Sequence, residues 1–339
     1  MLQEGGATYI GTEYGLFRLN KNDDFYQYTS YPAAWLNRYG GYLIFAEYLS
    51  NYREGIAIRA FEFSPRTEPY PTEMLYDGAA SYVQVDESGG WMYFLGDGTL
   101  WRESLAPLAS SGAAQFKPEA IGWSSPASAG GDAIPLPHDA PQIPALTPDG
   151  IYALISMSGN RYEEFVYRYS FDGSTAGRVD ELTDIACRGM FWYQEANVLL
   201  FRHDAQDYGS ARGDELSKTG GIYAYAPGSG KTAQLHSDGG SDFTVYYDAG
   251  RAFPHRLVVA GGTRNGSPAG LVTIDISGDT PGEPKRLYDG AAMMPNIAGG
   301  YIYFRAPAGR EGALYDYYRV PADGSSRAQR LDFVKRTIE

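Results

Sequence analysis

The sequence predicts an all-β protein built as a seven-bladed β-propeller, and three observations lead to this prediction. Its 339 residues include 29 Tyr, 15 Phe, 42 Gly and 20 Pro, which combines strand-forming aromatic residues with turn formers. Units of about four short strands recur at a spacing of about fifty residues, the period of propeller blades. The segment LYDGAA at residues 75–80 also recurs unchanged at 287–292, where it closes a different unit.

The first unit has three predicted strands, at residues 7–12, 16–20 and 25–29, and it lacks an innermost strand. The C-terminal tail, residues 334–339, is a predicted strand that belongs to no unit. Placing this tail in the vacancy pairs the exposed edges of the first and last blades. We therefore expect the C-terminal strand to complete the N-terminal blade, 7–30, and to close the ring.

Six full units follow within a single predicted domain, 1–339. They span residues 33–78, 79–123, 139–184, 186–237, 242–290 and 292–333. The last is the clearest, with strands at 301–305, 313–320 and 328–333 separated by a polar loop and a turn. Residues 124–141 are predicted to link two blades, because their prolines prevent strand pairing. A six-bladed alternative requires leaving out the irregular unit at 79–123.

The charge and the cysteine content exclude several classes of protein. A net charge of −13 argues against nucleic-acid binding, which needs clustered Lys and Arg. No apolar run is long enough to span a bilayer, and residues 1–6 do not form a signal peptide. The single cysteine, Cys187, excludes an internal disulfide framework and a cysteine-rich zinc site, and we expect it to be a buried thiol.

Several motifs have structural explanations. Residues 226–232 resemble a phosphate-binding loop, but a strand follows the lysine where that motif needs a helix, so we predict a hairpin turn. The four histidines, His138, His203, His236 and His255, fall in different units without the spacing of a metal site. For His138 and His203 we expect solvated loop residues. Alternatively, His138-Asp139 and His203-Asp204 could meet in a metal or acid–base site. The long acidic segment 204–220 lacks calcium-loop spacing, although its length favours a functional role.

Short repeated phrases carry a family resemblance. The segment 314–325, the aromatic–arginine pairs Phe17-Arg18, Trp101-Arg102 and Tyr167-Arg168, and the turn Asp172-Gly173-Ser174 recur across most of the chain. They resemble the repeat of bacterial extracytoplasmic propellers of the TolB-like and low-density-lipoprotein-receptor-like type. The resemblance implies a cell-envelope or secreted protein that binds a ligand and performs no chemistry, and it supplies no catalytic residues.

Aligning the units reveals a recurring arginine in the connection between the second and third strands. These residues are Arg53, Arg161, Arg212, Arg264 and Arg310, and Tyr52, Tyr162 and Tyr208 occupy the same connections. Equivalent propeller loops open on one face, so we expect an arginine rim suited to carboxylate or phosphate, with tyrosines that stack on sugars or peptides. Neighbouring acidic residues leave ordinary surface ion pairs as the alternative.

These observations predict a non-catalytic binding or scaffolding propeller. It would engage a protein partner or an anionic or glycan ligand, such as a cell-wall or extracellular glycan, through one loop face. We predict a monomer that is extracytoplasmic once a leader has been removed, with no cofactor, metal site or catalytic residue. One alternative is an enzyme (a lyase, hydrolase or cyclase) with its site at the channel mouth. The other is a cytoplasmic interaction propeller.

Overall fold

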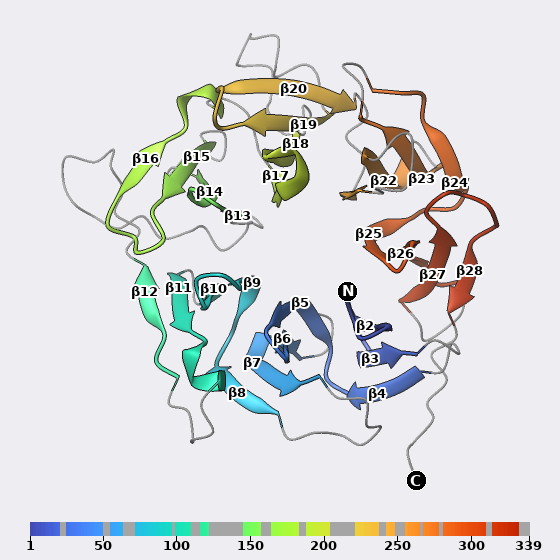
Figure 1. The fold of residues 1–339 in the computed structure, drawn as a ribbon. Coiled ribbons are helices and arrows are strands. Elements are labelled where there is room, and N and C mark those ends of the chain that lie inside the picture. Colours follow the sequence, from blue (N-terminus) through green and yellow to red (C-terminus); the bar gives the residue numbers. More distant parts are fainter. Residues whose placement is uncertain are drawn as a thin grey trace. The chain divides into compact units, whose positions relative to one another are not determined.

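The computed structural model describes residues 1–20, 25–49, 55–63, 72–96, 99–109, 116–121, 145–156, 164–182, 188–203, 221–236, 242–247, 255–264, 267–277, 281–309 and 314–331. Within these ranges the strands form seven four-stranded antiparallel sheets (Figure 1). The helices of these ranges are short 3-10 turns at Ala106–Ala109, Asp180–Leu182 and Gln194–Ala196. None of them is long and apolar enough to cross a membrane. The predicted fold class, an all-β seven-bladed β-propeller, is confirmed.

Each sheet consists of four strands that follow one another along the chain. The first three sheets are β1 (Leu2–Glu4), β2 (Ala7–Thr12), β3 (Gly15–Leu19) and β4 (Phe25–Thr29); β5 (Ala33–Tyr39), β6 (Tyr42–Tyr48), β7 (Gly55–Glu62) and β8 (Glu73–Asp77); and β9 (Ser81–Asp86), β10 (Trp91–Gly96), β11 (Thr99–Ser104) and β12 (Glu119–Ile121). Because β9 to β12 form a sheet, the six-bladed alternative is wrong.

The remaining four sheets repeat this order. They are β13 (Ala145–Thr147), β14 (Gly150–Ser156), β15 (Glu164–Tyr169) and β16 (Ala176–Arg178); β17 (Arg188–Tyr193), β18 (Val198–His203), β19 (Gly221–Ala226) and β20 (Lys231–His236); β21 (Asp242–Tyr247), β22 (His255–Arg264), β23 (Ser267–Asp275) and β24 (Lys285–Tyr288); and β25 (Met293–Ala298), β26 (Tyr301–Pro307), β27 (Tyr315–Pro321) and β28 (Gln329–Leu331).

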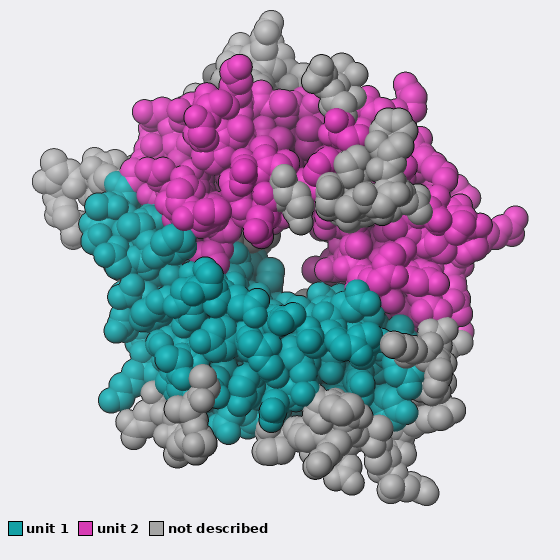
Figure 2. Space-filling view, in the orientation of Figure 1, with its two compact units in different colours: residues 1–140, 169–176, 333–339 teal, residues 141–168, 177–332 magenta. Residues whose placement is uncertain are grey.

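The chain divides into two compact units (Figure 2). The first unit contains residues 1–140, 169–176 and 333–339, and the second contains residues 141–168 and 177–332. The first three sheets therefore belong to the first unit. The turn between β15 and β16 belongs to it too, although most of its own sheet lies in the second unit. The single domain predicted for 1–339 stays a prediction.

The first sheet is complete without the C-terminal tail, so the predicted vacancy is wrong. Its innermost strand is β1, which pairs with β2 in the register Leu2↔Tyr9 and Glu4↔Ala7. Gly5 and Gly6 join the two strands with φ values of 56° and 76°, and a two-residue hairpin turn needs positive φ at both positions. The tail at 334–339 lies outside the described residues.

The second strands are buried on both faces, which explains why they are continuous apolar runs. On β6, Leu43 and Phe45 pack with Tyr9 of the first sheet. Ile44 points the other way, into a core with Phe94 of the third sheet. Successive strand residues point to opposite faces, so one strand supplies both cores. The core between neighbouring sheets is therefore built mainly from these strands.

Other predictions meet different outcomes. Residues 226–232 form the turn between β19 and β20, with Ala226 paired to Lys231, which confirms the hairpin. The expectation of a solvated His203 is wrong: it ends β18, is fully buried and packs edge-on against Tyr223, because the strand continues past the apolar run 198–201. Cys187, His138, the linker 124–141 and the loop 204–220 lie outside the described residues.

Candidate functional site

The predicted ligand-binding residues fall almost entirely outside the described part of the chain. This applies to Arg53, Arg161, Arg212, Arg310, Tyr52, Tyr162 and Tyr208. Arg264 is the last residue of β22, and its backbone alone is described. All eight stay predictions. By sequence, they belong to connections between the second and third strands of their sheets. We call the end of each sheet at which this connection lies its 2–3 edge.

In an antiparallel sheet of four consecutive strands, the first strand also begins at the 2–3 edge. Four first strands carry a β-bulge there, because three steps along the first strand oppose two along the second. The opposed pairs are Ala34↔Ala46 to Asn37↔Ile44, Ser81↔Leu95 to Gln84↔Tyr93, Arg188↔Arg202 to Phe191↔Leu200, and Met293↔Arg305 to Asn296↔Tyr303. The bulges are a repeated feature, and bulges are over-represented beside binding sites.

The first residue inside each bulge adopts a left-handed backbone conformation. These residues are Trp35 (φ 55°), Tyr82 (φ 54°), Gly189 (φ 60°) and Met294 (φ 50°). Glycine adopts this conformation freely, whereas a bulky side chain there is an outlier that costs about 1–3 kcal/mol. Strain of this kind concentrates at functional sites. Trp35 and Tyr82 are therefore the first residues to consider for a binding role.

An asparagine side chain holds two of these bulges in place. Asn37 Nδ2 donates to the carbonyl oxygen of Trp35 (2.7 Å) and to that of Val83 on β9 (2.9 Å). Asn296 Nδ2 donates to the carbonyl oxygen of Met294 (3.0 Å) in the same way. The hydrogen bond to Val83 also joins β5 to β9, which lie side by side in Figure 1. The two bulges therefore share the asparagine that holds them, and they differ in the residue at the left-handed position, Trp35 in one and Met294 in the other.

In the first unit the two strained residues form an aromatic cluster with a third ring. The Trp35 and Tyr82 rings have centroids 4.8 Å apart and planes inclined by 54°. Trp35 Nε1 donates a 2.7 Å hydrogen bond to the hydroxyl of Tyr48, which is buried at the end of β6. Trp35 and Tyr82 are partly exposed. We call Trp35, Tyr48 and Tyr82 the aromatic corner.

Both phenols of the corner stay protonated near neutral pH. Burial raises the pKa of Tyr82 to about 12. Burial also raises the pKa of Tyr48, against the opposing effect of the hydrogen bond from Trp35. The corner therefore presents neutral, rigid ring faces, which suit stacking against a ligand.

The charged residue that precedes Tyr48 on β6 is directed to the other face of the strand, toward β4. Glu47 precedes Tyr48, is 3% exposed, and its Oε2 lies 2.5 Å from Arg59 Nε. Its other oxygen, Oε1, accepts a 3.2 Å hydrogen bond from the Thr29 hydroxyl. The carboxylate is satisfied within the protein. It acts as a structural tie between β4, β6 and β7.

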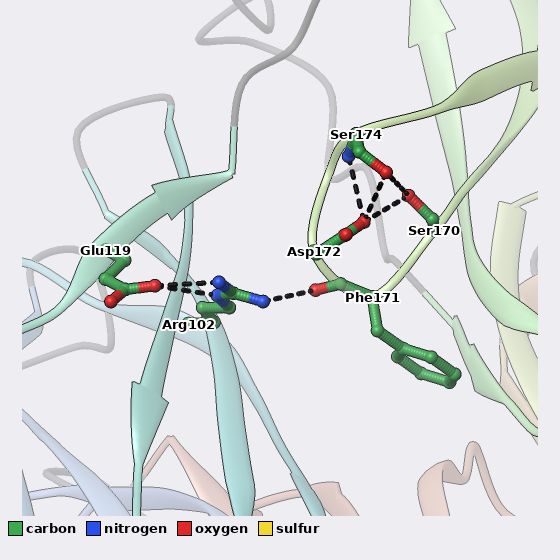
Figure 3. Close-up of polar contacts among 6 residues, drawn as sticks. All are labelled: Arg102, Glu119, Ser170, Phe171, Asp172 and Ser174. Atoms are coloured by element: carbon green, nitrogen blue, oxygen red, sulfur yellow. Dashed lines mark hydrogen bonds and ion pairs between the residues drawn. The ribbon is translucent and has the colours of Figure 1, made fainter.

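The Trp101-Arg102 pair and the Asp-Gly-Ser turn act structurally (Figure 3). Arg102 Nη2 lies 2.8 Å from Glu119 Oε2, and Arg102 Nη1 donates to the carbonyl oxygen of Phe171 (3.4 Å). Asp172 Oδ1 accepts hydrogen bonds from the backbone nitrogen of Ser174 (3.0 Å) and from the Ser170 hydroxyl (2.7 Å). These bonds hold the pKa of Asp172 far below its usual range. The arginine thereby joins its own sheet to the turn that follows β15.

The same kind of joint recurs in the second unit. Lys285 Nζ donates to the carbonyl oxygen of Asp323 (2.8 Å), and Asp323 Oδ1 accepts from the backbone nitrogen of Ser325 (2.9 Å). Gly324 occupies the left-handed position of this turn, as Gly173 does in the other (φ 66° and 72°). Arg102 and the two Asp-Gly-Ser turns, which are among the phrases that suggested a family, therefore join neighbouring sheets.

A buried carboxyl group, Glu103, gives a testable pH dependence. Glu103 is 3% exposed; its Oε1 accepts from the backbone nitrogen of Lys117 (2.9 Å), and its Oε2 has no partner among the described residues. Burial raises its pKa. The folded state thus holds this proton more tightly than the unfolded state, so the contribution of Glu103 to stability is complete at low pH and is lost as the pH rises through the raised pKa.

We expect Glu103→Gln to remove this dependence. The melting temperature of the variant minus that of the wild type should rise as the pH is raised from about 4 to 8, because only the wild type acquires a buried charge. Differential scanning calorimetry at several pH values measures it. Glu62→Gln, at an exposed position on β7, is the control and should leave the difference constant. Parallel curves for Glu103→Gln and the wild type would contradict the prediction.

A five-residue sequence pattern accompanies the bulges of the aromatic corner, and it is not among the repeats described above. The bulges at Trp35, Tyr82 and Met294 follow one five-residue pattern: alanine, any residue, a large residue, any residue, and Asn or Gln, at 33–37, 80–84 and 292–296. The last two copies directly continue the repeated segment LYDGAA. The pattern marks the bulge, but the meeting of Trp35 with Tyr82 is visible only in the structure.

Comparisons with known proteins identify the fold. No family model and no curated protein matches the chain. Among solved structures, apo AztD from Citrobacter koseri is 11% identical, with a TM-score of 0.56 and coverage of 96% of this chain and 94% of that one. The puromycin hydrolase S511A mutant complexed with PGG is 15% identical, with a TM-score of 0.59 and coverage of 96% of this chain and 51% of the hydrolase.

TolB from Acinetobacter baumannii is a further match, 12% identical, with a TM-score of 0.47 and coverage of 96% of this chain and 79% of that one. The chain spans about half the length of the hydrolase. At these identities the likenesses show the fold alone. The propeller fold is supported to that extent, and the TolB-like and receptor-like repeat types, the bacterial source and the extracytoplasmic location stay predictions.

Proposed function

We propose that this protein is a non-catalytic binding or scaffolding propeller that engages a protein partner or an anionic or glycan ligand through the 2–3 edges of its sheets. The observation that carries the proposal is the aromatic corner, where Trp35 and Tyr82 are held in strained backbone conformations and both residues are partly exposed. A cost of about 1–3 kcal/mol at each of two residues is retained where the position of the side chain matters.

Binding is favoured over chemistry because the polar groups around the corner are engaged with one another. Trp35 Nε1 donates to the Tyr48 hydroxyl, and Asn37 Nδ2 donates to two carbonyl oxygens. A general base or a nucleophile needs a titratable group that faces the substrate. What the corner offers instead is preorganised ring surface, which favours affinity. The location that fits this proposal is extracytoplasmic, and it rests on the repeat resemblance.

The predicted arginines extend the same proposal. Arg53 follows the corner residue Tyr48 by five positions, and Arg161, Arg212, Arg264 and Arg310 occupy the equivalent connections of four other sheets. Arginine binds carboxylate and phosphate groups through two parallel hydrogen bonds. We propose that these side chains, with Tyr52, Tyr162 and Tyr208, hold the acidic groups of a ligand.

Co-sedimentation tests the proposal with insoluble peptidoglycan, chitin and cellulose as glycans, heparin beads as a polyanion, and an immobilised peptide array for a protein partner. We expect at least one of them to retain the wild-type protein. The double variant Trp35→Gly/Tyr82→Gly should bind it at least about tenfold more weakly, because central aromatic side chains contribute most of the binding energy at interfaces. Met294→Gly, at the equivalent bulge of the second unit, is the matched control and should bind like the wild type.

The triple variant Arg53→Ala/Arg161→Ala/Arg310→Ala separates the two contributions. It should lose binding to heparin or to an acidic peptide and keep binding to neutral polymers. Unchanged retention of every acidic ligand would remove the arginines from the proposal. If nothing retains the wild type, the proposed function is wrong. Retention that is the same for the double-glycine variant would remove the aromatic corner from the proposal.

A further inference from the structure

The two aromatic residues at left-handed bulge positions both belong to the first of the two units. Four bulges share one backbone form, but the second unit has Gly189 and Met294 at the position where the first unit has Trp35 and Tyr82. A Cβ at Gly189 would meet only Phe243, at 3.7 Å, so the space there tolerates a side chain. The bulge itself therefore does not demand aromatic residues. Their presence at both positions of the first unit points to a local ligand site.

Resting on the proposed binding function, we propose that the aromatic corner binds a neutral pyranose ring of a glycan chain. A pyranose has one face of C–H bonds with slight positive charge, which complements the negative face of an aromatic ring. Two ring planes inclined by 54°, with centroids 4.8 Å apart, can contact both a face and an edge of one sugar. The Tyr82 hydroxyl, protonated near neutral pH, is a neutral hydrogen-bonding group for the sugar hydroxyls.

The charges around the corner favour a neutral ligand over a cation. Aromatic cages bind quaternary ammonium groups, and a nearby unpaired carboxylate would strengthen such binding. Here Glu47, the acidic residue next to Tyr48 in the sequence, lies on the other face of β6, almost fully buried and paired with Arg59. Burial is the cause of the raised pKa of Tyr82, with no carboxylate among the described residues contributing.

The backbone favours a sugar over an extended peptide. A peptide that joins a sheet needs a regular row of free backbone groups along the edge strand. The bulges of β5 and β9 break that row where the corner lies. Moreover, the carbonyl oxygens of Trp35 and Val83 already accept hydrogen bonds from Asn37. The corner can therefore contact a ligand through its aromatic rings, and a sugar binds by stacking on such rings.

Titration with soluble oligosaccharides tests the inference. The probes are cellohexaose, chitohexaose and maltohexaose, with a polyproline decapeptide and tetramethylammonium as the two rival chemistries. Isothermal titration calorimetry should show saturable binding of at least one hexasaccharide, with little change between low salt and about 1 M salt because no ion pair is formed. Trp35→Gly and Tyr82→Gly should each weaken it at least about tenfold, and Met294→Gly should not.

The variants are chosen so that folding is preserved. Glycine adopts the left-handed conformation without strain, as Gly189 does at the equivalent bulge. Trp35→Phe keeps a ring while removing the indole N–H that bonds to Tyr48, so it should retain more affinity than Trp35→Gly. Circular dichroism spectra that match the wild type establish that each variant is folded.

Each other outcome has a distinct meaning. Hexasaccharide binding that survives both glycine substitutions would place the sugar elsewhere and overturn the inference while leaving the binding function intact. Binding of polyproline or tetramethylammonium that requires Trp35 and Tyr82, without binding of sugars, would keep the site and overturn the ligand class. Absence of binding by every hexasaccharide overturns the inference as well, whereas the proposed function fails only if no material retains the wild type in the co-sedimentation experiment.

Discussion

Arg59→Met is expected to lower the free energy of unfolding by about 3 kcal/mol, because it leaves a buried carboxylate without its partner. Arg59 Nε lies 2.5 Å from Glu47 Oε2, and the Glu47 side chain is 4% exposed. Met preserves much of the apolar stem of arginine, so the loss reports the charge more than the packing. The value is at the lower end of the range for buried pairs, since the Arg59 side chain is 26% exposed and its own charge is partly solvated. Urea unfolding followed by tryptophan fluorescence measures the change.

Two comparisons isolate the cause. Adding Glu47→Gln to Arg59→Met should recover most of the loss, because the amide carries no charge and its oxygen still accepts from Thr29. Arg38→Met is the matched control: Arg38 also forms ion pairs, with Glu4 at 3.0 Å and Glu87 at 3.5 Å, but all three side chains are substantially exposed. Surface pairs contribute about 0–1 kcal/mol. Equal losses for Arg38→Met and Arg59→Met would show that burial of Glu47 is not the cause.

Gly15→Ala is expected to destabilise the first sheet by about 3 kcal/mol or more, through two effects that add. Gly15 starts β3 with a φ of 134°, a conformation that other residues rarely adopt. A Cβ at this position would also overlap the carbonyl oxygen of Thr29, at the end of β4. Both the clashing atom and the strained segment are backbone, so neither can move without displacing a strand. Hydrogen exchange of β2 to β4 reports the loss locally.

Two other glycines separate these effects. Gly40→Ala meets no atom within 4 Å but has a φ of 54°, so it should cost about 1–2 kcal/mol for the backbone alone. Gly177→Ala meets neither restriction and should be neutral or slightly stabilising. The expected order of destabilisation is Gly15, then Gly40, then Gly177. If Gly15→Ala costs no more than Gly40→Ala, the close approach of Thr29 is not what selects glycine there.

The joints between sheets show how a motif can be correct and yet say little about function. The Trp101-Arg102 pair and the turn at 172–174 suggested a family, and their atoms form one joint in the first unit. Arg102 also lies over the ring of Trp91, 4.8 Å from its centroid. Repetition in a repeat protein reports first what each unit needs in order to pack on the next. The residues that distinguish one unit from another, such as Trp35 against Gly189, carry the information about a ligand.

The sequence by itself determined the class of fold, the number of sheets and the order of their strands. These features are local: strand residues alternate with a period of two, turns need particular residues, and the same order recurs along the chain. Strand β1 could not be predicted, because its three residues are too few to show the alternation of a strand. The glycine pair Gly5-Gly6 that follows it is typical of a turn.

Only the tertiary structure decided which residues form the aromatic corner. Trp35 and Tyr82 come from the first strands of different sheets, and their rings meet because each bulge turns its residue into a left-handed conformation while Asn37 ties β5 to β9. The residues around Trp35 or Tyr82 determine neither the sign of φ at these positions nor the approach of β5 to β9. Both depend on the packing of one sheet against the next, and that packing selects the surface available to a ligand.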